Sequence, residues 1–347
     1  MLSIAVTGSA GALGKRVVQE LLGDPDVYRV VAIDRRLQRA TDDKMTVTRM
    51  AISEASEQGA NADLVTALTG CNSVVHAASD EGRATSHRQS GHMLERLLDA
   101  ATEAGVDHIV IISSAMVYGG LPDNAVPLAE DAPLRATDDL AFVAAKKEME
   151  RLATTWASNG HRAAILRPTT TLAEGRTSWI ARTLRMATTV RTDRVDPPVQ
   201  FVHYEDLASA AACVAVNHAS GAFNVSPDGF ISSEGFHQLV GGLQLRVPGD
   251  IADMWLRAGR RFGIRPTPVG IEPYVHNPWV VANDKLRSLG WTPRFTNEEA
   301  FVVGTPPAPW IIPHKRRQEV VLGLTAAAGV GIVTGAAILA RRILRSR

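Results

Sequence analysis

Short apolar runs alternate with longer stretches of mixed polar and apolar residues over the first third of the chain. Four of these runs have the length and the branched apolar residues of strands: SIAVTG (3–8), RVVAID (29–34), SVVHAAS (73–79) and HIVIISS (108–114). Each is followed by a segment long enough for a crossover helix, which is the pattern of βαβ units around a parallel sheet. The hydrophobic pattern therefore predicts a doubly wound α/β fold.

The pattern loosens after AAILRP (163–168). FVHYEDLASAAACVAV (201–216) and AFNVSP (222–227) are expected to return to the sheet, and residues 228–300 have the mixed character of a small lobe over the carboxyl edge of the strands. We therefore expect a large domain in residues 1–168, with its sheet completed by residues 200–226. The second lobe would be formed by residues 169–199 and 227–304.

The C-terminal region differs in kind. Residues 305–318 are rich in proline and basic side chains and predict a stiff linker, whereas residues 320–340 contain no charged side chain. As a helix those residues would be about 31 Å long, close to the ~30 Å of a bilayer core. We predict a transmembrane helix over residues 319–341 and a basic tail over 342–347, with an interfacial or buried helix as the alternative.

Small residues recur every four positions in the apolar segment, at Ala327, Gly331 and Gly335. Such a ridge could pair two helices in a homodimer. The alternative is that glycine and alanine are simply common in membrane helices.

Charge is distributed unevenly, although the net charge is only +1. Residues 315–347 carry seven Lys or Arg and one acid, which leaves 30 basic against 35 acidic side chains before them. An acidic body argues against a nucleic-acid partner. Positive residues flank the apolar segment almost equally, so they do not decide its orientation.

Cysteine and histidine usage restricts the chemistry further. Cys71 and Cys213 form neither a metal-ligand spacing nor a disulfide framework, and His87 and His92 have no acidic partner at ligand spacing, so no metal site is expected. The chain starts with an apolar run lacking a basic segment, so we expect no signal peptide. The expected location is the cell membrane, with a single-pass C-terminal anchor and the large domain in the cytoplasm.

The sequence TGSAGALG (7–14) lies between the first predicted strand and the helix-like KRVVQELL. Gly8 would form the tight turn, Gly11 would let backbone amides approach a pyrophosphate, and Gly14 would allow close packing of helix and strand. The candidate cofactor-binding set in this loop also includes Ala10, Ala12 and Leu13. The alternative is a tight crossover without a ligand.

Asp34 ends the second predicted strand, 20 residues after Gly14. Its carboxylate could accept both ribose hydroxyls of an NAD-type adenosine. The neighbouring Arg35 and Arg36 leave NADP open, because guanidinium groups could hold a 2′-phosphate. Asp34 would repel that phosphate, so we expect NAD.

The TGxxGxxG spacing resembles that of the short-chain dehydrogenase/reductase superfamily. Up to about residue 303 the chain resembles the extended branch, the NAD-dependent epimerase/dehydratase family, which implies a Rossmann-type fold. The elements that carry the resemblance are VVHAAS (74–79), IISSAMVYG (111–119), ILRPTTTLAEG (165–175), FVHYEDLASA, AFNVSP and DKLRSLGWTPRFTNEEAF (284–301). The resemblance assigns Ala77, Ala78 and Pro168 to the cofactor site and Ser114 to the catalytic site.

Members of that family carry a Tyr-xxx-Lys pair on the helix after the fifth strand. In AFVAAKKEME (141–150), Lys146 occupies the lysine position and Phe142 the tyrosine position. The resemblance implies that Lys146 binds the nicotinamide ribose. Phenylalanine cannot transfer a proton, and loss of a positioned general acid or base costs about 10² to 10⁴ in rate.

Two further departures concern specificity. Ala51 stands where the family usually has an aspartate near the adenine, and TTTLAEG replaces the usual loop lining the sugar site. Nucleotide-sugar specificity therefore does not carry over. Phe142 is expected either to pack in the core or to face the site, and His76 to be a packed structural residue.

Two functions follow from these observations. One is a membrane-tethered, NAD-dependent epimerase/dehydratase-type oxidoreductase, acting on a secondary alcohol or carbonyl of a small molecule that could be lipid-soluble. The other is a non-catalytic NAD(H)-binding protein with a structural or regulatory role at the membrane.

Overall fold

The computed structural model describes residues 1–52, 58–78, 87–174, 176–177, 179–187, 190–191, 196–240, 245–246, 254 and 270–305. The chain divides into two compact units, Met1–Thr305 and Pro306–Arg347. The predicted transmembrane helix, its basic tail and the linker after residue 305 lie outside the described residues. Within the described ranges, no helix is both long and apolar enough to span a bilayer.

Seven parallel strands form the central sheet, in the order β11-β6-β5-β4-β1-β2-β3. They are β1 (Leu2–Thr7), β2 (Val27–Asp34), β3 (Met45–Arg49), β4 (Ser73–His76), β5 (His108–Ile112), β6 (Arg162–Pro168) and β11 (Gly221–Val225). The inner strands are continuous apolar runs because helices cover both faces of the sheet. The predicted α/β fold with a parallel sheet is confirmed.

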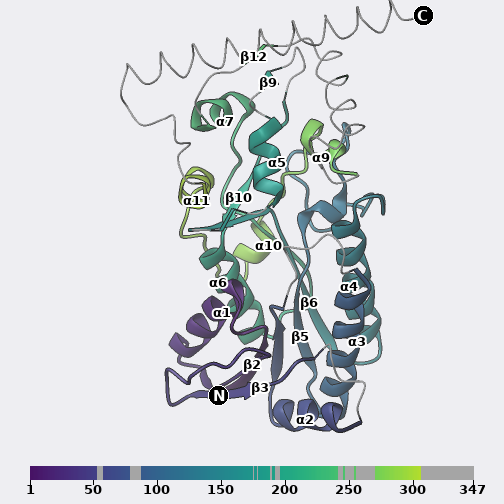
Figure 1. The fold of residues 1–347 in the computed structure, drawn as a ribbon, viewed down its shortest axis with the longest axis vertical. Coiled ribbons are helices and arrows are strands. Elements are labelled where there is room, and N and C mark those ends of the chain that lie inside the picture. Colours follow the sequence, from purple (N-terminus) through teal and green to yellow (C-terminus); the bar gives the residue numbers. More distant parts are fainter. Residues whose placement is uncertain are drawn as a thin grey trace, which may run out of the picture. The chain divides into compact units, whose positions relative to one another are not determined.

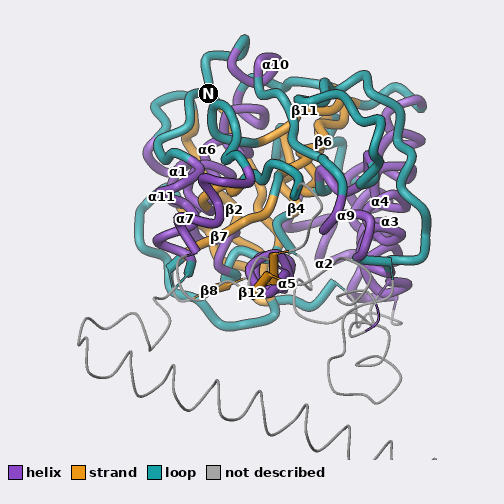
Figure 2. Tube along the Cα trace, turned by 90° about the horizontal axis from the view of Figure 1, so that it is seen from above, coloured by secondary structure: helices purple, strands orange, loops and turns teal. Residues whose placement is uncertain are grey.

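Helices lie on both sides of this sheet (Figures 1 and 2). One layer contains α1 (Ala12–Gly23) and α6 (Tyr204–Val216), and the other contains α2 (Gln58–Leu68), α3 (His87–Glu103) and α4 (Ala141–Ser158). Successive strand residues alternate between the two cores. Val6 packs with Leu207 under α6, whereas Ala5 packs with Leu97 under α3.

Two smaller sheets lie outside the central one. The first has the order β10-β7-β8, from β7 (Thr170–Ala173), β8 (Arg176–Thr177) and β10 (Phe201–His203), and the second pairs β9 (Val190–Arg191) with β12 (Leu245–Arg246). The expectation that residues 201–203 rejoin the central sheet is wrong, because Phe201 pairs with Thr170 of β7. The position beside β6 is filled by β11, in which Phe223 pairs with Leu166.

The remaining helical elements are η1, a 3₁₀ turn (Ala115–Tyr118), α5 (Trp179–Ala187), α7 (Ser233–Val240), α9 (Glu272–His276), α10 (Asp284–Arg287) and α11 (Asn297–Gly304). A separate apolar cluster around Phe201, Phe236 and Phe301 joins several of them to the β10-β7-β8 sheet. The expected pair of helices flanking LGWxP is present as α10 and α11.

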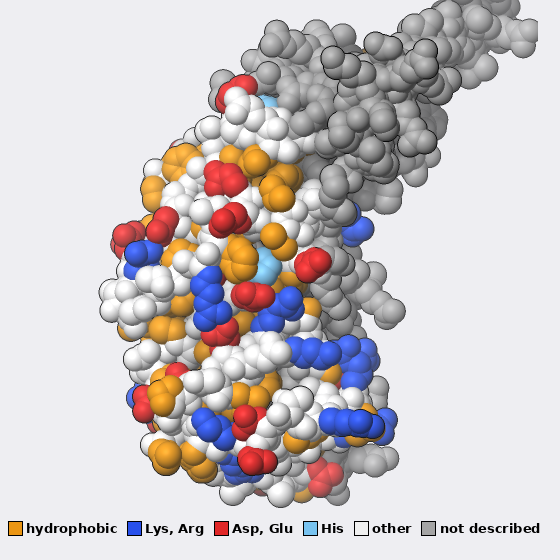
Figure 3. Space-filling model, turned by 90° about the vertical axis from the view of Figure 1, so that its left-hand side faces the viewer, with side chains coloured by type: hydrophobic (Ala, Val, Ile, Leu, Met, Phe, Trp, Pro, Cys, Tyr) orange, Lys and Arg blue, Asp and Glu red, His pale blue; other side chains and the backbone are white. Residues whose placement is uncertain are grey.

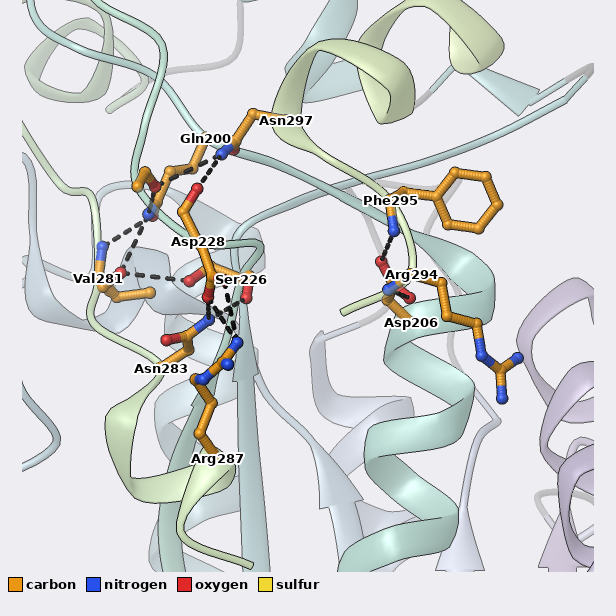
Figure 4. Close-up of polar contacts among 11 residues, drawn as sticks. Gln200, Asp206, Ser226, Asp228, Val281, Asn283, Arg287, Arg294, Phe295 and Asn297 are labelled. Atoms are coloured by element: carbon orange, nitrogen blue, oxygen red, sulfur yellow. Dashed lines mark hydrogen bonds and ion pairs between the residues drawn. The ribbon is translucent and has the colours of Figure 1, made fainter. Parts of the chain in front are cut away.

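The segment around α10 belongs to the central domain rather than to the second lobe. Leu286 and Trp291 are buried in the core beneath α1 and α6, and Trp291 Nε1 donates to Ser209 Oγ at 2.9 Å. Asp206 of α6 accepts from the main-chain N–H of Arg294 at 2.8 Å and of Phe295 at 3.2 Å (Figure 4). The assignment of residues 227–304 to one lobe is therefore wrong at this segment.

The segment from Val281 to Asn297 is called the arm below, and a second set of contacts in Figure 4 joins it to the end of β11. Gln200 exchanges two hydrogen bonds with the backbone of Val281, at 2.8 and 3.0 Å. Asn283 Nδ2 donates to Ser226 O and to Asp228 Oδ1, each at 2.9 Å. The arm is thus held at the carboxyl end of β11.

Charged side chains on the face shown in Figure 3 alternate in sign, with apolar side chains between them. Arg294 and Glu20 form one ion pair between the arm and α1, with N–O distances of 2.6 and 2.7 Å. Among the side chains that the figure colours by type, charges of one sign do not merge into a continuous patch.

Candidate functional site

The glycine loop connects β1 to α1 and leaves no room for side chains at two positions. Gly8 has φ +73°, and a Cβ there would lie 2.5 Å from Ala78 Cα. A Cβ on Gly14 would lie 2.1 Å from Gly8 O. Gly11 is the N-cap of α1, without a side-chain cap or an acidic residue in the first turn. The first-turn amides therefore form an uncapped positive helix end, suited to phosphate.

The other predicted loop residues contribute through their backbone. Leu13 packs into the core beside α6, so only its amide could face a ligand. Ala10 donates its amide to Asp34 Oδ2 at 3.0 Å. Ala12 opens the helix, Ala77 is buried at the end of β4, and Ala78 packs against Gly8.

Asp34 lies at the carboxyl end of β2 and is almost fully buried. Its Oδ1 accepts from Arg36 N at 2.8 Å and from Arg36 Nε at 3.3 Å. The carboxylate therefore joins β2 to the glycine loop, next to the space above the helix end. The side chain of Arg36 is exposed, and Arg35 accepts a hydrogen bond from Arg49 through its carbonyl oxygen.

His76 ends β4 and is buried, as expected of a structural histidine. Its Nδ1 is 2.8 Å from Thr7 Oγ1. Burial, together with a smaller contribution from the positive charge of Lys146, lowers the pKa of His76 to about 4. The ring is therefore neutral at pH 7.

Ser114 and Lys146 both lie at the carboxyl end of β5. Ser114 is the N-cap of η1, and its Oγ accepts from Met116 N at 3.2 Å. Lys146 is buried on α4, and its Nζ donates to Ile112 O at 2.7 Å, two residues before Ser114. The predicted catalytic pair thus lies at the same edge of the sheet as the glycine loop.

Phe142 lies one turn before Lys146 and is half-buried. Its ring centroid is 5.6 Å from Lys146 Nζ and 5.9 Å from the ring of Trp179, in an edge-to-face arrangement. The ring therefore packs against a second aromatic residue and lies near the buried ammonium. Sequence reasoning missed Trp179, which approaches from α5 of the second lobe.

Tyrosine hydroxyls near this edge already have buried partners. Tyr118 OH donates to Asn224 Oδ1 at 2.8 Å, and Tyr274 OH donates to Met116 O at 2.8 Å. Burial raises the pKa of both phenols, and for Tyr118 the nearby Arg167 partly opposes that rise. Neither hydroxyl replaces the one that Phe142 lacks.

A buried polar network under the site was also missed. Arg167 of β6 pairs with Glu150 of α4 at 2.7 Å, and Glu150 accepts from Ser113 Oγ. Arg167 also donates to Tyr118 OH at 2.8 Å. The sequence signal for this network was the charge of Arg167 inside the apolar strand ILRP, together with the acid Glu150 one turn after Lys146. The network joins β5, β6 and α4 just beneath Ser114 and Lys146.

Pro168 ends β6 and is paired with Val225. Thr169 and Thr170 follow it, both buried. Among the described residues, no group of three or more His, Cys, Asp or Glu side chains is arranged to hold a metal ion.

The site combines a parallel α/β sheet, a glycine loop, an acid that ends β2 and a buried lysine near the end of β5. This combination defines a dinucleotide-binding domain of the short-chain dehydrogenase type. The chain belongs to the NAD dependent epimerase/dehydratase family, whose model matches residues 4–226. The expected cofactor, NAD, is the cofactor of this family.

A curated relative is dTDP-glucose 4,6-dehydratase of Streptomyces griseus, 31% identical over 162 residues, which cover 43% of this chain and 48% of that protein. The chain thus aligns with about half the length of this relative. Similar solved structures include MoeE5 with UDP-glucose and NAD (TM-score 0.62, 23% identity, 87% of this chain and 97% of the other). UDP-glucose 4-epimerase of Thermus thermophilus with NAD is another (TM-score 0.61, 17% identity, 87% and 97%). These structures support the fold.

Proposed function

We propose that this protein is an NAD-dependent oxidoreductase of the epimerase/dehydratase type, acting on a secondary alcohol or carbonyl. The observation that carries the proposal is the buried ammonium of Lys146, held beside Ser114 at the edge where the glycine loop also ends. Gly8 and Gly14 support it, because side chains at these positions would collide with the backbone around the loop.

The residues present fit NAD. The first-turn amides of α1 would hold the pyrophosphate, Asp34 would accept from the adenosine ribose, and Lys146 would donate to the second ribose. Bound NAD would accept a hydride from a carbinol carbon, and the carbinol proton would leave through the Ser114 hydroxyl to solvent, because Phe142 cannot accept it. Ser114 would orient the reacting oxygen, and Phe142 and Trp179 would exclude water from that side.

Turnover is tested by changing the side chain at position 142. Phe142→Tyr restores a hydroxyl one turn before Lys146 and is expected to raise hydride transfer by about 10² to 10⁴. Turnover is measured as the epimerised or dehydrated product of UDP-glucose and dTDP-glucose, the sugar nucleotides named for the relatives, because an epimerase or dehydratase returns the hydride and leaves no net NADH. Phe142→Leu is the control, because it removes the ring without adding a hydroxyl. Equal rates for the Tyr and Leu variants, with NAD affinity intact, would contradict the proposal.

A non-catalytic NAD(H)-binding protein is the second candidate. It is favoured by the contact of Phe142 with Trp179, which places two apolar rings where the family carries a proton donor. In that case NAD raises the unfolding temperature, but neither the wild type nor Phe142→Tyr forms an epimerised or dehydrated product from the sugar nucleotides.

Membrane anchoring through residues 320–340 is proposed from the uncharged sequence alone, with the NAD-binding domain in the cytoplasm. A chain ending at Thr305 is expected to fractionate as soluble and the full chain with membranes. A full chain already found in the soluble fraction would refute anchoring. A lipid-soluble substrate would suit such an anchor, and oxidation of sterol or prenyl alcohols is measured separately, by the NADH that such a net oxidation releases.

A further inference from the structure

Three of the four tryptophans in the described part of the chain donate their indole N–H to a protein oxygen. The acceptors are Thr102 Oγ1 for Trp156, Tyr274 O for Trp279 and Ser209 Oγ for Trp291, at 2.8, 3.0 and 2.9 Å. The fourth, Trp179, has no acceptor for its N–H among the described residues. Because a buried indole N–H usually has a partner, the half-buried Trp179 differs from the other three in keeping its donor available.

Trp179 also lies beside the candidate catalytic residues. It is the first residue of α5, and the following Ile180 and Ala181 are buried in the apolar cluster that joins α5 to the β10-β7-β8 sheet. The indole contacts the Phe142 ring edge to face, with 5.9 Å between the centroids, and that ring lies 5.6 Å from Lys146 Nζ. The second lobe therefore brings a hydrogen-bond donor next to the position where the family carries the tyrosine hydroxyl.

The polar groups at this position indicate which kind of oxygen they fit. An indole N–H and a lysine ammonium can only donate, whereas a serine hydroxyl can donate and accept. Ser114 Oγ already accepts from Met116 N at 3.2 Å, which leaves its O–H to donate. Phe142 has no polar side-chain atom. Such a set of donors fits a carbonyl oxygen or an alkoxide, which accepts from more than one donor and needs no acceptor in return.

The tyrosine hydroxyls near this edge do not compete for the role. Tyr118 OH donates to Asn224 Oδ1, and Tyr274 OH donates to Met116 O. An indole N–H is too weak an acid to transfer its proton at neutral pH. Trp179 can therefore polarise a carbonyl or hold an alkoxide, but it cannot act as the general acid or base that a tyrosine provides.

We propose that the Trp179 indole N–H donates a hydrogen bond to the oxygen on the reacting carbon of the substrate, and that this contact favours a carbonyl compound over the corresponding alcohol. The inference rests on the proposed oxidoreductase site and names Trp179 as a further catalytic residue. It accounts for a tryptophan with an available N–H that meets Phe142, the residue that lacks the family's hydroxyl.

The test uses cyclohexanone as the carbonyl probe and methylenecyclohexane, in which a CH₂ group replaces the oxygen, as the matched ligand control. Dissociation constants for the full chain saturated with NAD are measured by nuclear magnetic resonance titration. Trp179→Phe removes the N–H and keeps an aromatic ring on Phe142, whereas Trp156→Phe removes an indole N–H at the other end of α4. Phe142→Tyr on the Trp179→Phe background returns a hydroxyl donor. Urea midpoints and NAD affinity verify that each variant folds and keeps its cofactor site.

Trp179→Phe is expected to weaken cyclohexanone binding about two- to tenfold, the usual range for one hydrogen bond, and to leave methylenecyclohexane binding unchanged. Trp156→Phe should bind both probes like the wild type, and the added Phe142→Tyr should recover most of the lost affinity. Equal losses for both probes, or unchanged cyclohexanone binding in Trp179→Phe, would overturn the inference. A wild type that does not bind cyclohexanone would overturn it as well.

The same measurements separate this hydrogen bond from the proposed turnover. A loss of cyclohexanone affinity in Trp179→Phe, without any product from the sugar nucleotides, supports the hydrogen bond and refutes turnover. Product formation combined with cyclohexanone binding that does not depend on Trp179 supports turnover and refutes the hydrogen bond.

Discussion

Arg167→Met is expected to destabilise the protein strongly because it leaves a buried carboxylate without its cation. Arg167 and Glu150 contact each other at 2.7 and 3.1 Å, and their side chains are only 7% and 6% exposed. Without the guanidinium, Glu150 retains only Ser113 among its described hydrogen-bond partners. Removing one partner of a buried ion pair costs about 3–5 kcal/mol.

A double-mutant cycle measures this effect. Urea unfolding at pH 7 is followed for Arg167→Met, Glu150→Leu and the double variant. The double variant buries no unpaired charge, so it should lose much less stability than the two single variants added together. Single costs below about 1 kcal/mol that simply add would refute the reasoning, because they would mean that water reaches the pair.

The same cycle has a functional readout. Glu150 lies one turn after Lys146 and holds Ser113, which precedes Ser114. Arg167→Met should therefore weaken NAD binding at temperatures where the variant is still folded. An unchanged NAD affinity would show that the network supports the fold without positioning the site.

Two further predictions concern the cofactor and acidic conditions. Asp34→Ser removes the carboxylate that binds Ala10 N and Arg36. The ratio of the affinity for NAD to the affinity for NADP should therefore fall about tenfold or more. An unchanged ratio, measured by calorimetry, would contradict the role of Asp34. Burial lowers the pKa of His76 and of His108 to about 4, below the ~6.5 of an unfolded chain. Below pH 6.5 the unfolded state therefore binds protons that the folded state does not. The free energy of unfolding should be unaffected above pH 6.5. Between pH 6.5 and 4 it should fall by about 1.4 kcal/mol per pH unit for each histidine. Urea midpoints at pH 7 and pH 5 measure this loss, and His108→Gln should reduce it; the same loss in wild type and variant would contradict the contribution of His108.

Much of the fold and of the candidate cofactor site could be predicted from residues that lie close together in the sequence. The glycines of the first loop and Asp34 are recognisable because each is required by short-range geometry, namely a turn, a close backbone approach and a strand end. Lys146 is recognisable by its spacing on one helix. Such features depend on residues near one another in the chain.

Contacts between distant segments could not be predicted in this way. The strand at 201–203 has the apolar character of a sheet strand, and nothing in its composition tells whether it pairs with β6 or β7. The Glu150–Arg167 pair and the contact of Trp179 with Phe142 each join elements that only the chain's path brings together. The same holds for Trp291, which packs under α6 rather than in the second lobe.

The sequence by itself determined the parallel α/β architecture, the dinucleotide loop and the absence of a tyrosine hydroxyl before Lys146, because periodicity, glycine positions and residue identity are properties of the chain. Only the tertiary structure decided that an aromatic ring from α5 covers Phe142 and that the Thr169 and Thr170 hydroxyls are buried without partners among the described residues. Burial and hydrogen-bond satisfaction depend on which segments meet in space, and that is settled by the packing of the whole domain.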